Sequence, residues 1–217
     1  RRNEFRFFSP EGDALAEYRF NTLDGETGFG RVFGRWGEIL VGGYRASGQG
    51  SPYIGVAESP VVNSDDGGLY AYFHADTLDS TTWPRQGTQA SGRYRQSLTS
   101  MGALESGEFA GLLGGKAMTI GKDVVYLSIE AQDIIKGPEL IDNVTTLGGF
   151  LRLSGLHPDQ LIGLKGGLAR MMYYHELTTF NLGSMTQRMY VGFSAETGAV
   201  YNEGDSVTWP SLRIAGS

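Results

Sequence analysis

The sequence contains no cysteine among its 217 residues, which excludes a disulfide scaffold and a metal site built on thiolates. It also lacks any run of about 18 apolar residues, so a transmembrane helix is excluded. A membrane location stays open, because a β-strand crosses a bilayer with roughly 9–11 residues of alternating polarity. The net charge of -6 and the lack of a basic stripe argue against a nucleic-acid partner.

Glycine and aromatic residues, by contrast, are abundant. The chain has 33 glycines, 11 tyrosines, 11 phenylalanines and 3 tryptophans, and this glycine share is about twice the usual ~7 %. The glycines are scattered through apolar stretches and follow no collagen-like period. Glycine inside strands marks bends, bulges and close approach of two backbones, which a curved β-barrel needs.

Strand-like alternation of polar and apolar residues recurs along the chain, with little helical periodicity. It is clearest over residues 69–75, 89–95, 125–132 and 189–196, and a tight hairpin is predicted around Gly37. About ten or eleven consecutive strands predict an all-β antiparallel meander, and a long meander tends to close into a barrel. Periodicity alone leaves two alternatives open, a water-soluble barrel and a transmembrane barrel whose polar faces line the lumen.

Four stretches carry a resemblance to a known superfamily. Asp76–Gly87 resembles the periplasmic hairpin "DTLD…(F/W)P-x-x-G" of bacterial surface-antigen barrels, which include outer-membrane assembly and two-partner secretion proteins. Gly34–Gly42 resembles a "G-x-(Y/W)-G-E-L-x-x-G" hairpin, Leu147–Leu156 a lumen loop with a "GG…RG(F/Y)" core, and Phe193–Gly198 the "F-x-D-x-G" strand motif that the loop contacts. Their order and spacing resemble the branch in which the barrel follows a patatin-like phospholipase domain, the type V secreted patatins.

The resemblance implies a set of site residues in the lumen loop and on its partner strand. They are Gly148, Gly149, Arg152, Gly155, Phe193, Glu196 and Gly198. The chain departs from the family pattern at two places: Ser154 stands where the loop Arg is expected, and Glu196 replaces the strand Asp. We therefore expect Arg152 and Glu196 to form a bidentate pair that holds the loop against the wall. The alternative is that both side chains are merely solvated.

The resemblance assigns four more residues to the periplasmic hairpin: Asp76, Asp79, Pro84 and Gly87. Pro84 and Gly87 are expected to turn the chain. The two aspartates are expected to cap the turn through bonds from their side chains to the backbone, because the spacing of a calcium loop is missing.

Catalytic and cofactor motifs are not evident in the sequence. A patatin enzyme needs a Gly-x-Ser-x-Gly elbow, and the closest stretch, Gly192–Glu196, ends in Glu and lies inside a predicted strand. Ser64–Gly68 contains the Asp-Gly-Gly triplet of the second patatin motif but has no elbow to partner it. We interpret it as a loop tip at the end of a mostly loop-like region over residues 47–64. No cofactor and no metal ion are expected, since the histidines lack ligand spacing.

The sequence therefore predicts a membrane-embedded module that is not itself an enzyme. Residues 1–217 are expected to form a single partial barrel domain of a longer protein, because the chain starts at Arg1 without Met and stops within a predicted strand. By resemblance it would anchor and export an upstream lipid acyl hydrolase in the bacterial outer membrane. Its expected partners are outer-membrane lipids, that upstream domain as cargo, the outer-membrane assembly machinery and a second copy in a homodimer. The alternatives are a pore for assembly or two-partner secretion, and a soluble ligand-binding β-barrel.

Overall fold

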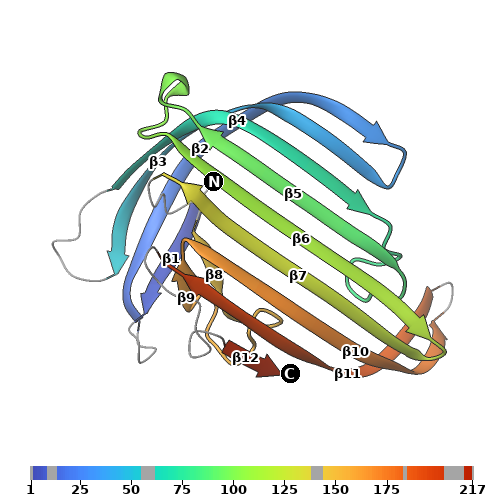
Figure 1. Ribbon diagram of the computed structural model, residues 1–217. Helices are drawn as coiled ribbons and strands as arrows, with labels where there is room; N and C mark the ends of the chain where they lie inside the picture. Colours follow the sequence, from blue (N-terminus) through green and yellow to red (C-terminus); the bar gives the residue numbers. More distant parts are fainter. Residues whose placement is uncertain are drawn as a thin grey trace.

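The molecule is built around one large curved sheet. A computed structural model of the chain describes residues 2–8, 14–54, 62–137, 144–182, 185–202 and 213–216. Ten strands form an antiparallel sheet in the order β1-β2-β3-β4-β5-β6-β7-β10-β11-β12 (Figure 1). The fold class predicted from the sequence, an all-β antiparallel meander, is confirmed. No helix in the described ranges has the length and apolar character needed to cross a membrane.

Strand bounds show how regular the meander is. Consecutive strands pair throughout the main sheet, except that β7 pairs with β10 across a small β8–β9 hairpin. A short 3-10 helix, η1 (Thr99–Met101), lies in the β5–β6 connection. The strands are β1 Arg2–Phe8, β2 Ala14–Phe33, β3 Gly37–Ile54, β4 Val62–Asp76, β5 Gly87–Ser97, β6 Gly107–Ile120, β7 Asp123–Lys136, β8 Thr145–Leu147, β9 Leu161–Gly163, β10 Lys165–Leu182, β11 Met185–Tyr201 and β12 Arg213–Gly216.

The hairpin predicted around Gly37 is confirmed, with a turn over residues 34–36, but the region after it differs from the prediction. Strand β3 continues to Ile54, and Ser64–Gly68 lies inside β4, so the interpretation of that segment as a loop tip is wrong. Its residues pair with Tyr44–Gly48 of β3. Polar and glycine-rich residues are locally weak strand formers, and here the long register with β3 satisfies their backbone groups.

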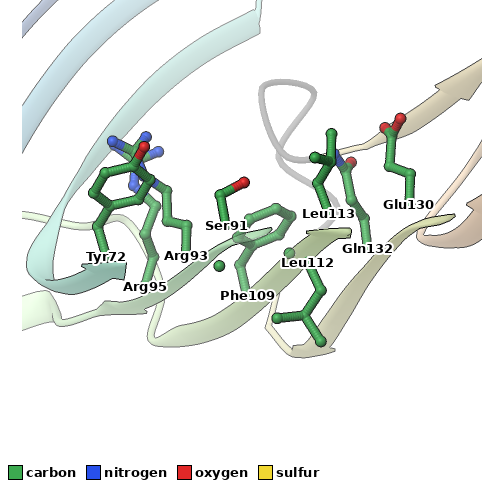
Figure 2. Close-up of a pocket in the computed structure, with 11 residues that line it drawn as sticks. Tyr72, Ser91, Arg93, Arg95, Phe109, Leu112, Leu113, Glu130 and Gln132 are labelled. Atoms are coloured by element: carbon green, nitrogen blue, oxygen red, sulfur yellow. The ribbon is translucent and has the colours of Figure 1, made fainter. Parts of the chain in front are cut away.

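The two faces of the sheet differ in polarity. Because successive strand residues point to opposite sides, each strand contributes one set of side chains to each face. Figure 2 shows this at β6, where Leu112 points away from the side on which Leu113, Gln132 and Glu130 lie. The convex face exposes a large number of apolar side chains: Phe29, Ile39, Val41, Leu69, Phe73, Leu112, Leu127, Ile129, Met171, Val191 and Phe193.

The concave face carries polar, aromatic and aliphatic side chains, and many of these are buried. Its best-buried members are Tyr44, Asp66, Tyr70, Val124, Tyr126, Met172, Tyr174, Ser194 and Glu196. One apolar cluster on this face, Ala117, Val124, Tyr126, Met172 and Tyr174, is covered by Leu78 and Leu151 from two connections. Curvature brings distant strands together: Arg95 of β5 binds Glu26 of β2 at 3.1 Å. Among the described residues the sheet is open, with β1 and β12 paired on one side only.

Candidate functional site: a loop anchored on the concave face

The predicted lumen loop lies against the concave face of β7, β10 and β11. Short strands β8 and β9 bring it in from the end of the sheet, and residues 148–160 connect them (Figure 1). Leu147 and Leu153 are fully buried in a cluster with Leu168 of β10. Complete burial of a leucine side chain contributes about 1.5–3 kcal/mol, so these two residues seat the loop before any polar contact is counted.

Backbone conformation explains the two glycines that open the loop. Gly148 and Gly149 have φ values of 136° and 97°, which L-residues rarely adopt. A Cβ on Gly148 would also lie 2.1 Å from the carbonyl oxygen of His157. Leu151 and Leu153 are left-handed as well, at 60° and 72°. Such a conformation costs a non-glycine residue about 1–3 kcal/mol, so it requires support from the surrounding contacts.

Glu196 supplies much of this support. The residue is 2 % exposed, and its carboxylate accepts hydrogen bonds from the Leu153 amide at 2.7 Å and the Ser154 amide at 2.8 Å. The hydroxyl groups of Ser154 and Ser194 donate to it at 3.0 and 2.7 Å. Hydrogen bonds to a charged acceptor are stronger than neutral ones. The Glu196 side chain therefore holds the loop through two backbone amides of the loop and through the Ser154 hydroxyl group.

The predicted ion pair between Arg152 and Glu196 is wrong. Arg152 instead forms a bidentate pair with Glu130 of β7, at 2.7 and 3.0 Å, and donates to the carbonyl oxygen of Thr146. The reason is geometric: Arg152 and Ser154 lie on different sides of the loop, and Ser154 occupies the position next to Glu196. Two carboxylates on two strands therefore hold the loop, where one had been expected.

Arg170 of β10 is a third anchor that the sequence did not reveal. It lies opposite Glu196 of β11 and Ser128 of β7 in the sheet register. Its guanidinium donates to the carbonyl oxygen of Leu151 at 3.1 Å and lies over the ring of Tyr126. The guanidinium of Arg170 thus holds a carbonyl group of the loop backbone, and the carboxylate of Glu196 holds two of its amides.

The other predicted loop and strand residues divide into two groups. Gly198 is required, because a Cβ there would lie 3.2 Å from Leu147 and 2.8 Å from the carbonyl oxygen of Gly167. Gly155 has open space around its Cα, so the structure shows no steric need for glycine there. Phe193 points to the convex face, where it is 53 % exposed and its ring contacts Tyr173. It therefore does not face the loop.

The second motif, Asp76–Gly87, forms a strap across the concave face at the opposite end of the strands. We use "strap" for residues 77–86, which connect β4 to β5. As predicted, its aspartates cap the turn: Asp76 accepts from the Leu78 amide at 2.8 Å, and Asp79 accepts from the amides of Arg85 and Gln86 at 2.8 and 3.2 Å. Gly87 has a φ of 107°, and a Cβ there would collide with the carbonyl group of Thr77.

The strap reaches past β6 and β7 to strands β10 and β11. Arg85 forms an ion pair with Glu176 of β10, and this hydrogen bond raises the pKa of Arg85, so the guanidinium stays charged. The carbonyl oxygen of buried Pro84 accepts from the Tyr174 hydroxyl. The Trp83 ring meets Tyr174 edge-on at 5.2 Å and stacks on Tyr190 at 5.8 Å. These contacts join the two halves of the sheet across its concave side.

Metal binding finds no support in the ranges that the structure describes. Within them, no group of three or more His, Cys, Asp or Glu side chains could hold a metal ion. His74 stacks on Tyr72, and His175 binds Asp123 at 2.8 Å on the convex face.

Comparisons with known proteins leave the family unassigned. No family model matches the chain, and no curated protein matches it.

Proposed function

We propose that this chain is the membrane-embedded part of an outer-membrane β-barrel that anchors or exports an attached domain. The observation that carries the proposal is the polarity of the sheet, which is inverted relative to a water-soluble protein. Apolar side chains cover the exposed convex face, and polar side chains are buried on the concave face. A contiguous exposed apolar surface of this kind is rare on soluble monomers, whereas transmembrane barrels are apolar outside and polar inside.

Two cross-strand polar pairs bracket this apolar surface on β7 and β10. Lys165 binds Asp133 at 3.0 Å near one end, and His175 binds Asp123 near the other. Every convex side chain between them is apolar or aromatic: Val125, Leu127, Ile129, Ala131, Gly167, Ala169, Met171 and Tyr173. The ten-residue separation corresponds to about 34 Å along a strand. At a tilt near 45° it covers roughly 24 Å, close to the ~25 Å apolar band of outer-membrane barrels.

Arg31 of β2, in register with Ile39, and Lys116 of β6 are charged residues on the convex face. Arg31 lies two residues from the end of its strand. Lys116 is exposed on the convex face of β6, in register with Leu127. Its strand ends four residues later, at Ile120, and a lysine stem can lie along apolar surface while its ammonium group reaches the polar rim. The band therefore tolerates this residue. In lipid the open edges of β1 and β12 also need partners, because unpaired backbone groups are not tolerated there.

The nature of the attached domain rests on the sequence resemblance. Four motifs resemble surface-antigen barrels of the patatin branch. The loop and the strap that two of them encode are each anchored to distant strands by hydrogen bonds and ion pairs. We propose that the barrel displays or exports a patatin-like lipid acyl hydrolase carried by the same gene. The role proposed for this chain is structural, with outer-membrane lipids and the assembly machinery as its partners.

Leu112 and Leu113 point to opposite faces of the sheet, so the same substitution at each position tests whether the convex face meets lipid. The gene product is expressed in a Gram-negative host, and its outer-membrane fraction is compared by gel mobility with and without heating. We expect a heat-dependent mobility shift for the wild type, since closed barrels resist detergent until heated. Leu112→Arg places a charge on the convex face and should reduce recovery of this form severalfold, because Arg in the bilayer costs up to about 2–4 kcal/mol.

Leu113→Arg is the matched control. It introduces the same side chain one residue later, on the concave face beside Glu130, and should leave recovery nearly unchanged. Soluble recovery with no mobility shift would overturn the membrane assignment and favour a soluble ligand-binding β protein. A membrane barrel whose gene encodes several small α/β repeats in place of a patatin elbow would indicate an assembly or secretion pore.

A further inference from the structure

We propose that the concave face holds a binding site for a small organic anion, with one carboxylate or phosphate group on an apolar body. A hollow of about 320 Å³ lies over β5, β6 and β7. It borders the loop at Glu130, and no strap residue lines it. Figure 2 shows the side chains around it, with Arg93, Arg95 and Tyr72 at one end and Gln132 and Glu130 at the other.

The hollow exists because β6 has a glycine, Gly111, on its concave face. The sheet register aligns Arg93 of β5, Gly111 of β6 and Gln132 of β7 in one row. Gly111 contributes no side chain, so the row is open between the arginine and the glutamine. Two interstrand spacings separate the outer members, about 10 Å between their backbones. A Cβ on Gly111 would make only ordinary contacts with Phe109 and Gln132, at 3.5 and 3.8 Å. Backbone crowding therefore does not explain this glycine.

The end formed by Arg93 and Arg95 favours an anion. Both guanidinium groups share one carboxylate, Glu26, at 3.4 and 3.1 Å. The next carboxylate, Asp66, lies beyond Tyr44 and accepts a hydrogen bond from its hydroxyl group. Arg95 lies over the Tyr44 ring at 4.2 Å. Its Nε atom is buried and has no hydrogen-bond partner among the described residues. Arginines held in place by aromatic rings bind oxyanions without losing much side-chain entropy.

The remaining walls suit an apolar body with a polar substituent. Phe109 is in register with Arg95 and forms apolar surface beside the basic end. Leu113 forms apolar surface beside Glu130 at the other end, and Ser91 and Gln132 offer hydrogen-bonding groups. Glu130 also lines the hollow, but its charge is already compensated by the bidentate pair with Arg152. Among the charged residues that line the hollow, only the arginines carry charge beyond that of their partners. The site would accept a small monoanion of this kind whether the protein lies in a membrane or in water.

The experiment titrates the folded full-length chain with matched probes by calorimetry. Phenylacetate and phenyl phosphate carry an acid group on a ring, and they distinguish carboxylate from phosphate recognition. Benzyl alcohol lacks the charge, and inorganic phosphate lacks the apolar body. We expect at least one of the two aromatic acids to bind about tenfold or more tightly than either control, since a hydrogen bond to a charged group contributes about 1.5–3 kcal/mol. Affinity should fall as salt rises.

Variants of β6 and β5 distinguish binding in the hollow from nonspecific binding elsewhere on the protein. Gly111→Leu fills the hollow and should abolish saturable binding. Gly114→Leu introduces the same side chain on the convex face of β6, where a Cβ meets only Ile129 at 3.5 Å, and should leave binding unchanged. Arg95→Gln should weaken binding about tenfold or more, with circular dichroism confirming the β-sheet. Equal binding by Gly111→Leu and wild type, or benzyl alcohol binding as tightly as the acids, would overturn the proposal.

Discussion

The convex and concave faces of this sheet use the same strands in opposite ways. On the convex face, side chains such as Ile129 and Phe193 are apolar and exposed. On the concave face, Glu196 and Ser194 are polar and buried. In a water-soluble sheet the hydrophobic effect places the apolar set inside. Under the proposed function, lipid around the convex face accounts for its exposed apolar set. The concave face is held by polar networks together with two apolar clusters.

From this comparison we expect substitution of the buried Glu196 to lower the free energy of unfolding more than any other single change on the concave face. Glu196→Ala leaves the amides of Leu153 and Ser154 without this acceptor. We expect a loss of about 3–5 kcal/mol in the free energy of unfolding, because buried donors remain unpaired. The measurement is equilibrium unfolding in denaturant, with limited proteolysis of residues 148–160 as a local reporter.

Glu196→Gln serves as the control for side-chain size. It keeps an acceptor oxygen beside the loop but removes the charge, so its effect should lie between that of the wild type and that of Glu196→Ala. A stability equal to the wild type for both variants, together with an intact loop, would show that leucine packing alone seats the loop.

The strap should be the next most sensitive region. Trp83→Ala removes the ring that contacts Tyr174 and Tyr190, and we expect a loss of about 2 kcal/mol, since the ring is 45 % exposed and its stacking adds only about 0.5–1.5 kcal/mol to burial. Protease cleavage within residues 77–86 should become faster. Thr82→Ala, at the exposed neighbouring position, is the control. Unchanged cleavage in Trp83→Ala would mean that the Arg85–Glu176 pair suffices to hold the strap.

The sequence could predict the meander and the capping aspartates because both depend on local patterns. Alternation along β7 placed Glu130 on the polar face, and the turn residues around Asp79 identified the strap as a turn. Pairing between distant segments could not be derived in this way. Glu130 meets Arg152 only because β7 pairs with β10 across the β8–β9 hairpin, and no local signal specifies that register.

Ser154 shows the same limit at the level of one residue. It stands where the resembled family has an arginine, and that departure was visible in the sequence. Its consequence was not, since the loop conformation depends on left-handed backbone at Leu151 and Leu153. Those two leucines give no local indication of such a conformation. Arg152 was therefore assigned to the wrong carboxylate.

The exposed ion pair should show the smallest effect. Arg152 and Glu130 are 40 % and 19 % exposed, so solvent screens their attraction, and Arg152→Ala should cost about 1 kcal/mol or less in the free energy of unfolding. A double-mutant cycle with Glu130→Ala isolates the pair from the lost contact with Thr146. A coupling energy as large as the effect of Glu196→Ala would reverse the order of the two anchors. A small coupling energy would show that burial of Glu196, and not the bidentate geometry of Arg152, determines how firmly the concave face holds its loop.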